Sequence, residues 1–295
     1  MIKLDNICKS FDDILAVDQV TFEIEKGDIY GLLGPNGAGK TTTIRMLMGI
    51  IEPDRGQVLR NEKIITRRDR LKFGYLPEER GLYQKQKLKE SLMYFGRLRG
   101  MNRHTISSNI DRWLERFNFT QDANRKIREL SKGNQQKVQF ILALFHQPEF
   151  VILDEPFTGL DPLNQVLLKE IIEEKRQEGV TFIFSTHQME QVERICTNIC
   201  LMNKGKVLIE GPLSDIKEKH RKNAVTVRYE GILDAHQITR FIQDPEMAND
   251  EVSGVLKVKP NDFINWLNQK VNILSFTQRT PSLEQIFIEE VRAES

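Results

Sequence analysis

The stretch Gly34-Pro35-Asn36-Gly37-Ala38-Gly39-Lys40-Thr41 decides the fold of this chain, because it fills the phosphate-loop pattern G-x-x-x-x-G-K-[ST] at every position. A buried strand over 28–33 is predicted before it and a helix over 40–50 after it. Glycines let backbone N–H groups converge on phosphate oxygens, and the helix N-terminus adds a positive dipole end. Every residue of the stretch, together with Thr42, is therefore a predicted nucleotide-binding residue.

Two side chains of this loop carry specific expectations. Lys40 is expected to reach the β- and γ-phosphates of a nucleotide, and the Thr41 hydroxyl is expected to bind Mg²⁺. The alternative is a glycine-rich turn that binds nothing. Such a turn needs neither a lysine nor a hydroxyl at these two places, so the nucleotide site is favoured.

The apolar run Phe150-Val151-Ile152-Leu153 ends in two carboxylates, Asp154 and Glu155. Asp154 is expected to hold Mg²⁺ at the end of a strand. Glu155 is expected beside the γ-phosphate, where a carboxylate can orient and deprotonate the attacking water. On its own, an apolar run that ends in Asp-Glu is about as often a plain strand entering a loop as it is part of a functional site. With the phosphate loop upstream, it predicts a Mg²⁺-dependent nucleotide hydrolase.

The order of the remaining patterns predicts an α/β fold of the P-loop NTPase type. Alternating residues near 2–4 and 20–24 predict an antiparallel sheet at the start of the chain. Strands over 150–153 and 180–184, with a helix over 163–177 between them, predict a parallel sheet with crossover helices. Residues 84–147 carry helical periodicity and are expected to form a helical subdomain. A hairpin is expected to turn at Gly205.

A second, smaller α+β domain is predicted at the end of the chain. The expected boundaries are 1–215 for the nucleotide-binding domain, 216–224 for a charged linker and 225–295 for the small domain. The expected elements of the small domain are strands over 225–229, 255–258 and 271–276, helices near 236–243 and 263–269, and a last helix opened by a capping box of Ser282 and Gln285.

Composition excludes several classes of protein. The 295 residues are 39% hydrophobic and 29% charged, which is typical of a globular chain of about two domains. Forty-three Lys and Arg against 42 Asp and Glu give a net charge of +1, which indicates no nucleic-acid partner. Three cysteines favour a reducing compartment, and no apolar stretch predicts a signal peptide or a membrane span.

The histidines and cysteines outside these motifs receive modest interpretations. His104, His146, His220 and His236 have no partner at motif spacing and are interpreted as surface residues. Cys196 and Cys200 lie four apart without a second Cys/His pair, so structural thiols are favoured over a zinc site.

Between the phosphate loop and Asp154, the stretch Leu130-Ser131-Lys132-Gly133-Asn134 resembles the LSGGQ signature of the ATP-binding cassette (ABC) ATPases. This resemblance implies ATP and Mg²⁺ as cofactors and two ATP molecules sandwiched between two cassettes. Ser131 and Gly133 would then face the γ-phosphate bound by the second copy, because they open a helix whose N-terminus suits an anion. Ser131 also suits an N-cap, and the two roles are compatible.

Further motifs of the same family follow in the expected order over about residues 1–215. They are Phe11 as the aromatic that stacks on adenine, Gly74-Tyr75-Leu76-Pro77-Glu78 as the Q-loop, Pro156-Phe157-Thr158-Gly159-Leu160-Asp161 as the D-loop, and Ser185-Thr186-His187 with the switch histidine. The resemblance implies a catalytic role for His187 at the γ-phosphate and a nucleotide-site role for Asp161.

The sequence departs from the family pattern at three positions. Lys132 replaces the first glycine of the signature and Asn134 its glutamine; the effect of either change is open. Glu78 stands where glutamine is usual. Its carboxylate is expected to approach Mg²⁺ or the attacking water, but it adds a negative charge beside the phosphates and so bears on the turnover rate.

The tail Thr280-Pro281-Ser282-Leu283-Glu284-Gln285-Ile286-Phe287 resembles the ending of ATPase subunits of type-2 exporters. That implies a second nucleotide-binding subunit, identical or different, a separately encoded transmembrane permease, and a cytoplasmic location at the inner face of the cell membrane. Residues 60–103 carry 13 Lys and Arg against 5 Asp and Glu. This basic stretch either faces anionic lipid or is a solvated surface.

Two other functions are weighed against the exporter subunit. A soluble ABC ATPase acting on the ribosome or DNA is disfavoured, because the chain has one cassette and no long coiled coil or zinc cluster pattern. A regulatory cassette without turnover is disfavoured by Lys40, Asp154, Glu155 and His187, which are all present. The transported substrate is not indicated by the sequence.

Overall fold

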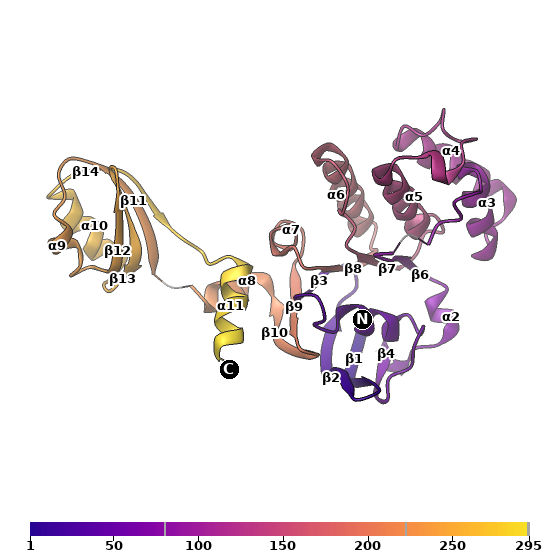
Figure 1. Ribbon diagram of the computed structural model, residues 1–295, viewed down its shortest axis with the longest axis horizontal. Coiled ribbons are helices and arrows are strands. Elements are labelled where there is room, and N and C mark those ends of the chain that lie inside the picture. Colours follow the sequence, from indigo (N-terminus) through magenta and orange to yellow (C-terminus); the bar gives the residue numbers. More distant parts are fainter. Residues whose placement is uncertain (80, 222, 294–295) are drawn as a thin grey trace. The chain divides into compact units, whose positions relative to one another are not determined.

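The computed structural model describes residues 1–79, 81–221 and 223–293. The chain divides into two units, Met1–Leu213 and Ser214–Ser295, and each is described by itself (Figure 1). The sequence-based boundaries of 215 and 225 remain a prediction.

The described residues of the first unit form ten strands and a set of helices. The strands are β1 (Ile2–Phe11), β2 (Ile14–Ile24), β3 (Ile29–Leu33), β4 (Arg55–Arg60), β5 (Lys63–Ile64), β6 (Phe73–Leu76), β7 (Phe150–Asp154), β8 (Thr181–Thr186), β9 (Asn198–Asn203) and β10 (Lys206–Pro212). The helices are α1 (Lys40–Leu47), α2 (Arg67–Arg70), α3 (Leu88–Leu98), α4 (Arg103–Arg116), the short 3₁₀ helix η1 (Ile127–Glu129), α5 (Lys132–Leu144), α6 (Pro162–Gln177) and α7 (Met189–Glu193).

A six-stranded sheet in the order β10-β9-β3-β8-β7-β6 forms the centre of the first unit. All its pairs are parallel except β10 with β9, which form the predicted hairpin around Gly205. The predicted β–α–β order is confirmed, since α6 connects the neighbouring parallel strands β7 and β8. Every residue of β3 and β7 is buried, as expected of strands covered on both faces.

The register of this sheet decides where the functional side chains lie. Leu33 pairs with Thr186, and Asp154 pairs with Ser185. The carboxyl ends of β3, β7 and β8 therefore meet at one edge of the sheet. Residues that follow these strands in sequence, including the phosphate loop, become neighbours in space at that edge.

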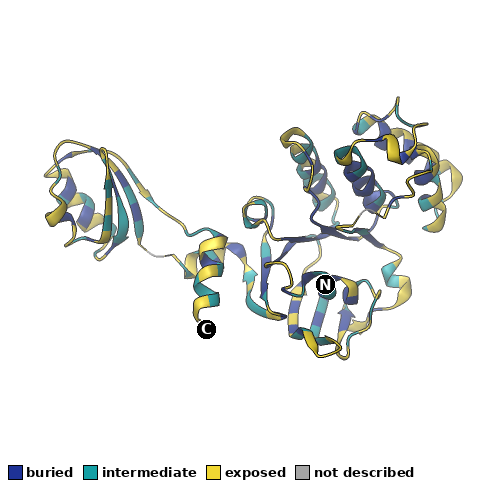
Figure 2. Cartoon of the chain, viewed as in Figure 1, coloured by how far each residue is buried: buried dark blue, intermediate teal, exposed yellow. Residues whose placement is uncertain are grey.

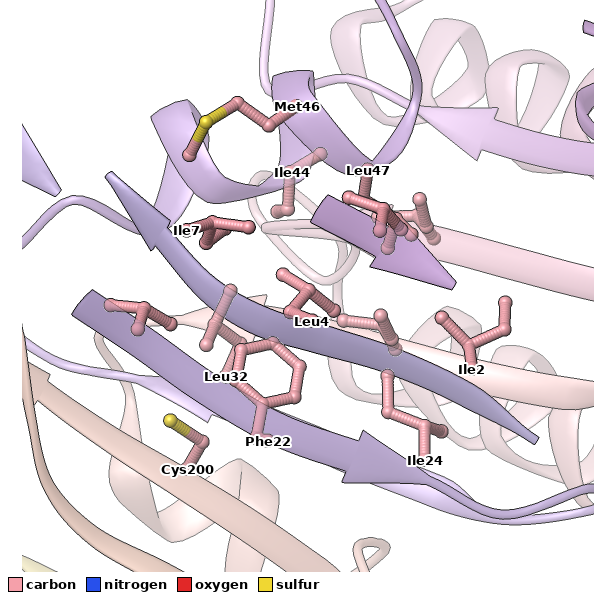
Figure 3. Packing of buried hydrophobic residues seen from close by; sticks show 14 of the residues in the cluster. Ile2, Leu4, Ile7, Phe22, Ile24, Leu32, Ile44, Met46, Leu47 and Cys200 are labelled. Atoms are coloured by element: carbon pink, nitrogen blue, oxygen red, sulfur yellow. The ribbon is translucent and has the colours of Figure 1, made fainter. Parts of the chain in front are cut away.

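An antiparallel sheet in the order β2-β1-β4-β5 shares a core with α1. Figure 3 shows Leu4 and Ile7 of β1 and Phe22 of β2 in one apolar cluster with Ile44 and Leu47 of α1. These side chains are at most 3% exposed, and burial of each contributes about 1.5–3 kcal/mol. This packing fixes the helix that follows the phosphate loop. Figure 2 shows that the strands of the central sheet are mostly buried, whereas the outer faces of the helices are exposed.

The second unit is a four-stranded antiparallel sheet with helices, in the strand order β12-β13-β11-β14. Its elements are β11 (Ala224–Glu230), α9 (Ala235–Ile238), β12 (Ile242–Ala248), β13 (Glu251–Leu256), α10 (Pro260–Asn268), β14 (Asn272–Gln278) and α11 (Leu283–Ala293), preceded by α8 (Leu213–Lys219). Val227, Val252 and Phe263 are fully buried in its own apolar core. An α+β fold of this part of the chain is confirmed.

Three details of the second unit differ from the expectation. The strand expected over 255–258 begins earlier, at Glu251, and ends at Leu256. The helix expected near 236–243 ends at Ile238, and Ile242 begins a strand that the sequence analysis missed. This strand, β12, lies at the sheet edge and has a register shift between Gln243 and Glu246, and such positions tolerate its proline. Residues 216–219 of the expected linker belong to α8. The capping box is present, since Ser282 and Gln285 exchange hydrogen bonds of 3.0 and 3.2 Å.

The interpretation of the four histidines is right for His104 and His236, which are exposed, and wrong for the other two. The His146 ring lies 3.1 Å from the Phe73 carbonyl oxygen, and burial lowers its pKa to about 4. His220 Nε2 lies 2.7 Å from Glu290 Oε1. Both rings are partly buried because partners far along the chain cover them, which spacing within the sequence does not reveal.

Candidate active site

The phosphate loop connects the end of β3 to the start of α1 and approaches its neighbours closely. Gly34 and Gly39 have φ angles of +146° and +100°, a region that side-chain-bearing residues rarely adopt. A Cβ at Gly34 would collide with the Met202 carbonyl oxygen, and one at Gly39 would lie 2.7 Å from the Ala16 carbonyl oxygen. Both glycines are therefore required by backbone geometry and by space.

Lys40 folds back over this loop. Its Nζ donates hydrogen bonds to the carbonyl oxygens of Gly34 at 2.7 Å and Pro35 at 3.0 Å. The side chain is only 8% exposed, and this burial lowers the pKa of Lys40. Negative charges on Glu155, Asp154 and Glu78 act in the opposite direction. The ammonium group thus lies between the loop backbone and a group of carboxylates.

A cleft of about 560 Å³ opens at this edge of the sheet. Its size suits a nucleotide, since ligand pockets commonly measure roughly 300–1,000 Å³. It brings together most of the predicted site residues, which come from three separate parts of the sequence. The lining consists of Ile14, Leu15, Ala16, Asn36, Gly37, Ala38, Gly39, Lys40, Thr41, Thr42, Glu78, Asp154, Glu155 and Lys204.

Asp154 is the most deeply buried acid of the cleft, at 2% exposure. Burial raises its pKa to about 6, and the charges of Glu78 and Glu155 act in the same direction. Within the described part of the chain, its Oδ2 atom has no hydrogen-bond partner although it is buried. A buried carboxylate oxygen without a partner needs a ligand. With the Thr41 hydroxyl and the Glu78 carboxylate, it supplies the hard oxygen donors that Mg²⁺ prefers, so these residues suit the ion.

Glu155 is held in one orientation by three hydrogen-bonding groups. Its Oε2 accepts from Thr186 Oγ1 at 3.0 Å, and its Oε1 accepts from the His187 backbone N–H at 2.9 Å. The His187 ring Nδ1 lies 2.6 Å from the same Oε1. The Glu155 backbone has a φ of +49°, which costs about 1–3 kcal/mol in a residue other than glycine. Such a conformation aims the carboxylate out of the strand end and into the cleft.

Several predicted residues lie outside the lining of the cleft. Phe11 pairs with Ile14 at the β1–β2 hairpin, is 45% exposed, and has Lys9 Nζ 5.8 Å from its ring centroid. Gly34 and Pro35 reach the site only through their carbonyl contacts with Lys40. His187 reaches it through Glu155.

The signature residues lie at the start of α5. Ser131 is the N-cap of this helix and accepts a hydrogen bond from the Asn134 N–H at 3.2 Å. A Cβ on Gly133 would lie 3.1 Å from the Gly159 carbonyl oxygen, so the signature and the D-loop are in close contact. Asp161 is the N-cap of α6 and accepts from Asn164 N–H at 2.9 Å. Hydrogen bonds to Asn164 lower the pKa of Asp161.

The sequence analysis missed two residues. Gln136, one turn into α5, is 4% exposed and its Nε2 donates to the carbonyl oxygens of Pro156 at 3.2 Å and Glu155 at 3.4 Å. Its signal was a polar residue within an apolar-faced helix. Lys204 lines the cleft from the β9–β10 turn, and only the neighbouring Gly205 was noticed.

Comparisons with known proteins agree with the motifs. The family ABC transporter matches residues 17–158, and the family "ATP-binding protein DrrA1-3-like, C-terminal domain" matches residues 211–291. The ABC transporter ATP-binding protein YhaQ of Bacillus subtilis is 42% identical over 99% of both chains. The Nod factor export ATP-binding protein I of Bradyrhizobium diazoefficiens is 33% identical over 97% of this chain and 95% of its own.

Two solved structures resemble the first part of the chain. An ATP-binding subunit of an ABC transporter, 30% identical, covers 74% of this chain and 92% of its own with a TM-score of 0.70. A dimeric bacterial ABC transporter cassette, 23% identical, shares the fold over 72% of this chain and 99% of its own with a TM-score of 0.65. The chain belongs to the ABC transporter family. The prediction of an ATP-binding subunit of that family is confirmed.

Proposed function

We propose that this chain hydrolyses ATP to drive export, as one of two nucleotide-binding subunits on a separately encoded membrane permease. The observation that carries the proposal is the cleft in which the phosphate loop, the buried carboxylate of Asp154 and the oriented Glu155 meet. The likeness to a Nod factor export protein over nearly the whole chain supports the direction of transport.

Each residue of the cleft has a distinct task in this proposal. The phosphate loop N–H groups and Lys40 bind the β- and γ-phosphates, and Lys40 exchanges its carbonyl contacts for phosphate oxygens. Bound Mg²⁺ would offset the phosphate charge, held by Asp154 and Thr41 with Glu78 nearby. Glu155 orients the attacking water and accepts its proton. His187 keeps Glu155 in place and donates a hydrogen bond toward the γ-phosphate.

A second cassette completes the site. Ser131 and Gly133 lie at an N-terminal helix end, where a positive dipole end and backbone N–H groups suit the γ-phosphate of the partner's ATP. The dimeric cassette of the same fold supports this arrangement. The two subunits are identical or different copies, and Phe11 stacks on adenine at the rim.

The permease docks on the helical part of the first unit. Among the described residues, Leu71, Tyr83, Tyr94 and Leu98 are 40–59% exposed there, and the Tyr83 and Tyr94 rings lie 5.6 Å apart. Grouped exposed apolar side chains of this kind mark protein contact sites. No helix among the described residues is long and apolar enough to cross a bilayer, so in this proposal the chain acts at the inner face of the membrane through the permease.

The basic stretch 60–103 is weaker support for a membrane contact. Arg60 pairs with Asp69 at 3.0 Å, Lys72 pairs with Glu149 at 2.5 Å, and Arg99 donates to the Leu71 carbonyl oxygen at 3.2 Å. Arg80 lies outside the described residues. The charge of this stretch is thus partly used within the fold, which favours the solvated surface over lipid binding.

The proposal is tested with the Glu155→Gln variant, which keeps ATP bound in the closed dimer. The variant is affinity-purified from detergent-solubilised membranes with ATP and Mg²⁺, beside the wild type, and co-purifying chains are identified by mass spectrometry. A stoichiometric polytopic membrane protein is expected. Tyr94→Ala in the same background should lose it, whereas Ile232→Ala, at a 97% exposed position, should not. Recovery of ribosomes or nucleic acid without a membrane chain would sink the exporter proposal.

A further inference from the structure

Lys204 lies in the turn that joins β9 to β10, far in sequence from the phosphate loop. Lys204 and Gly205 have φ angles of +46° and +82°, the conformation of a two-residue hairpin turn of type I′. Asn203 and Lys206 pair on either side of it. The turn therefore has a defined geometry that fixes where the side chain of Lys204 starts.

This turn is bonded directly to the nucleotide site. The Gly205 N–H donates to the Ala38 carbonyl oxygen at 3.1 Å, within the phosphate loop. The Gly205 carbonyl oxygen accepts from the Asp18 N–H at 2.8 Å, which anchors the turn to β2. A Cβ on Gly205 would lie 2.9 Å from the Ala16 carbonyl oxygen, so no other residue fits there. The residue that follows Lys204 in the sequence is thus bonded directly to the phosphate loop.

Lys204 is an exposed residue of the cleft lining. Its side chain lines the cleft together with Ile14, Leu15 and Ala16, and no carboxylate among the described residues forms an ion pair with it. Of the acids that line the cleft, Asp154 and Glu155 are buried and Glu78 is exposed, and all three act on the pKa of Lys40. The neighbouring Lys206, by contrast, lies 3.6 Å from Asp18 and does not line the cleft.

We propose that Lys204 is a second cation that binds the nucleotide. It binds an oxygen of the α-phosphate, the phosphate next to adenosine, whereas Lys40 binds the β- and γ-phosphates. Two lysines in one cleft match the several negative charges of a nucleotide better than one. Adenosine carries no phosphate, so Lys204 discriminates in favour of nucleotides over nucleosides. The inference rests on the proposed function, because it assumes ATP in this cleft.

The test compares Lys204→Ala with Lys206→Ala in the full-length chain, by competition of ATP, ADP and adenosine against a fluorescent ATP analogue. Lys204→Ala should weaken ATP and ADP binding about three- to tenfold and leave adenosine unchanged. High salt should shrink the difference, since the ion pair is exposed. Lys204→Arg should restore most of the affinity, and Lys206→Ala should stay within about twofold of wild type. In ATPase assays, Lys204→Ala should raise KM with kcat unchanged.

Three results would overturn the inference. They are wild-type affinities in Lys204→Ala, an equal loss for adenosine, and an equal effect of Lys206→Ala, which would point to the turn and not to the charge. If the wild type hydrolyses ATP while any of these is seen, only the role of Lys204 fails. If the wild type binds no ATP at all, the proposed function fails as well.

Discussion

His187 and Glu155 form a direct pair, with ring Nδ1 2.6 Å from carboxylate Oε1, and the same oxygen accepts the His187 backbone N–H at 2.9 Å. Glu155, the proposed base, and His187, the proposed switch histidine, are therefore one hydrogen-bonded unit at the end of two neighbouring strands. Movement of the loop after β8 necessarily moves the contact to Glu155. This pairing makes the orientation of the base depend on where His187 lies.

Replacement of His187 by alanine should lower kcat about a hundredfold, the usual size of a lost acid–base or positioning group. ATP affinity should change little, because the phosphate loop is untouched. Single-turnover hydrolysis and nucleotide binding are measured on the same preparation. An ATPase rate within twofold of wild type would contradict the role given to His187.

Asp154 gives a pH dependence of stability. Its pKa is raised by burial from an ordinary 3.8 to about 6, so the folded chain retains a proton that the unfolded chain has lost between these values. The free energy of unfolding therefore falls as pH rises through this window, by about 3 kcal/mol for this group. Asp154→Asn should raise the melting temperature of the metal-free protein at pH 8, less at pH 5, inside the window, and have little effect below pH 3.8.

The same variant tests the metal site. Mg²⁺ should raise the melting temperature of the wild type at pH 8, because it binds the folded chain through Asp154. The Asp154→Asn protein should respond weakly, and its ATPase activity should be lost. Equal stabilisation of both proteins by Mg²⁺ would place the ion elsewhere.

Gln136 is expected to act as a positioning residue for Glu155, because its Nε2 donates to the carbonyl oxygens of Glu155 and Pro156. Gln136→Leu should lower kcat about tenfold with little change in KM, because the strained Glu155 backbone loses its support. Gln139→Leu, also on α5 and buried but bonded to the Glu79 carbonyl oxygen, is the matched control. Equal losses in both variants would indicate a general disturbance of α5.

His220 links α8 to α11 in the second unit. Burial lowers the pKa of His220, but hydrogen bonds to Glu290 and the Ile216 carbonyl oxygen, with the charges of Glu290 and Glu289, outweigh it and raise the pKa. The stabilisation is fully present below the unfolded pKa, near 6.5, and is lost as pH rises through the folded value. Hydrogen exchange of α11, corrected for intrinsic rates, should quicken over this range, and Glu290→Gln should weaken the dependence.

The parts of the site that the sequence predicted depend on local patterns and on one rule of parallel sheets. The phosphate loop and the Asp154-Glu155 pair each follow an apolar strand, and parallel strands bring their carboxyl ends together. The order of the strands in the six-stranded sheet was not needed to predict that Lys40 and Asp154 lie close together. The capping box at Ser282 is likewise local, because its partners are three residues apart.

Features that depend on long-range packing escaped prediction. The contact of Gln136 with Pro156 joins two segments 20 residues apart, and Gly205, the neighbour of Lys204, bonds Ala38 where β9 lies beside β3. The edge strand β12 lacks alternation because its bulge and proline interrupt it. The partly buried His146 owes its environment to Phe73, on β6. The contacts of Gln136, Gly205 and His146 depend on how segments far apart in the sequence pack together, which no local pattern contains.

The bonds that hold the phosphate loop have a consequence for the kinetics of nucleotide exchange. Gly205 fixes Ala38 from outside, the Thr43 N–H donates to Gly39 at 2.9 Å, and Lys40 fixes Gly34 from within. The anion-binding backbone is therefore preorganised, and a nucleotide arrives at a loop that needs no refolding. Its association rate should then vary little among variants of the site, so differences in affinity appear as differences in residence time. Rigidity of the loop makes departure, and not arrival, the adjustable step of the cycle.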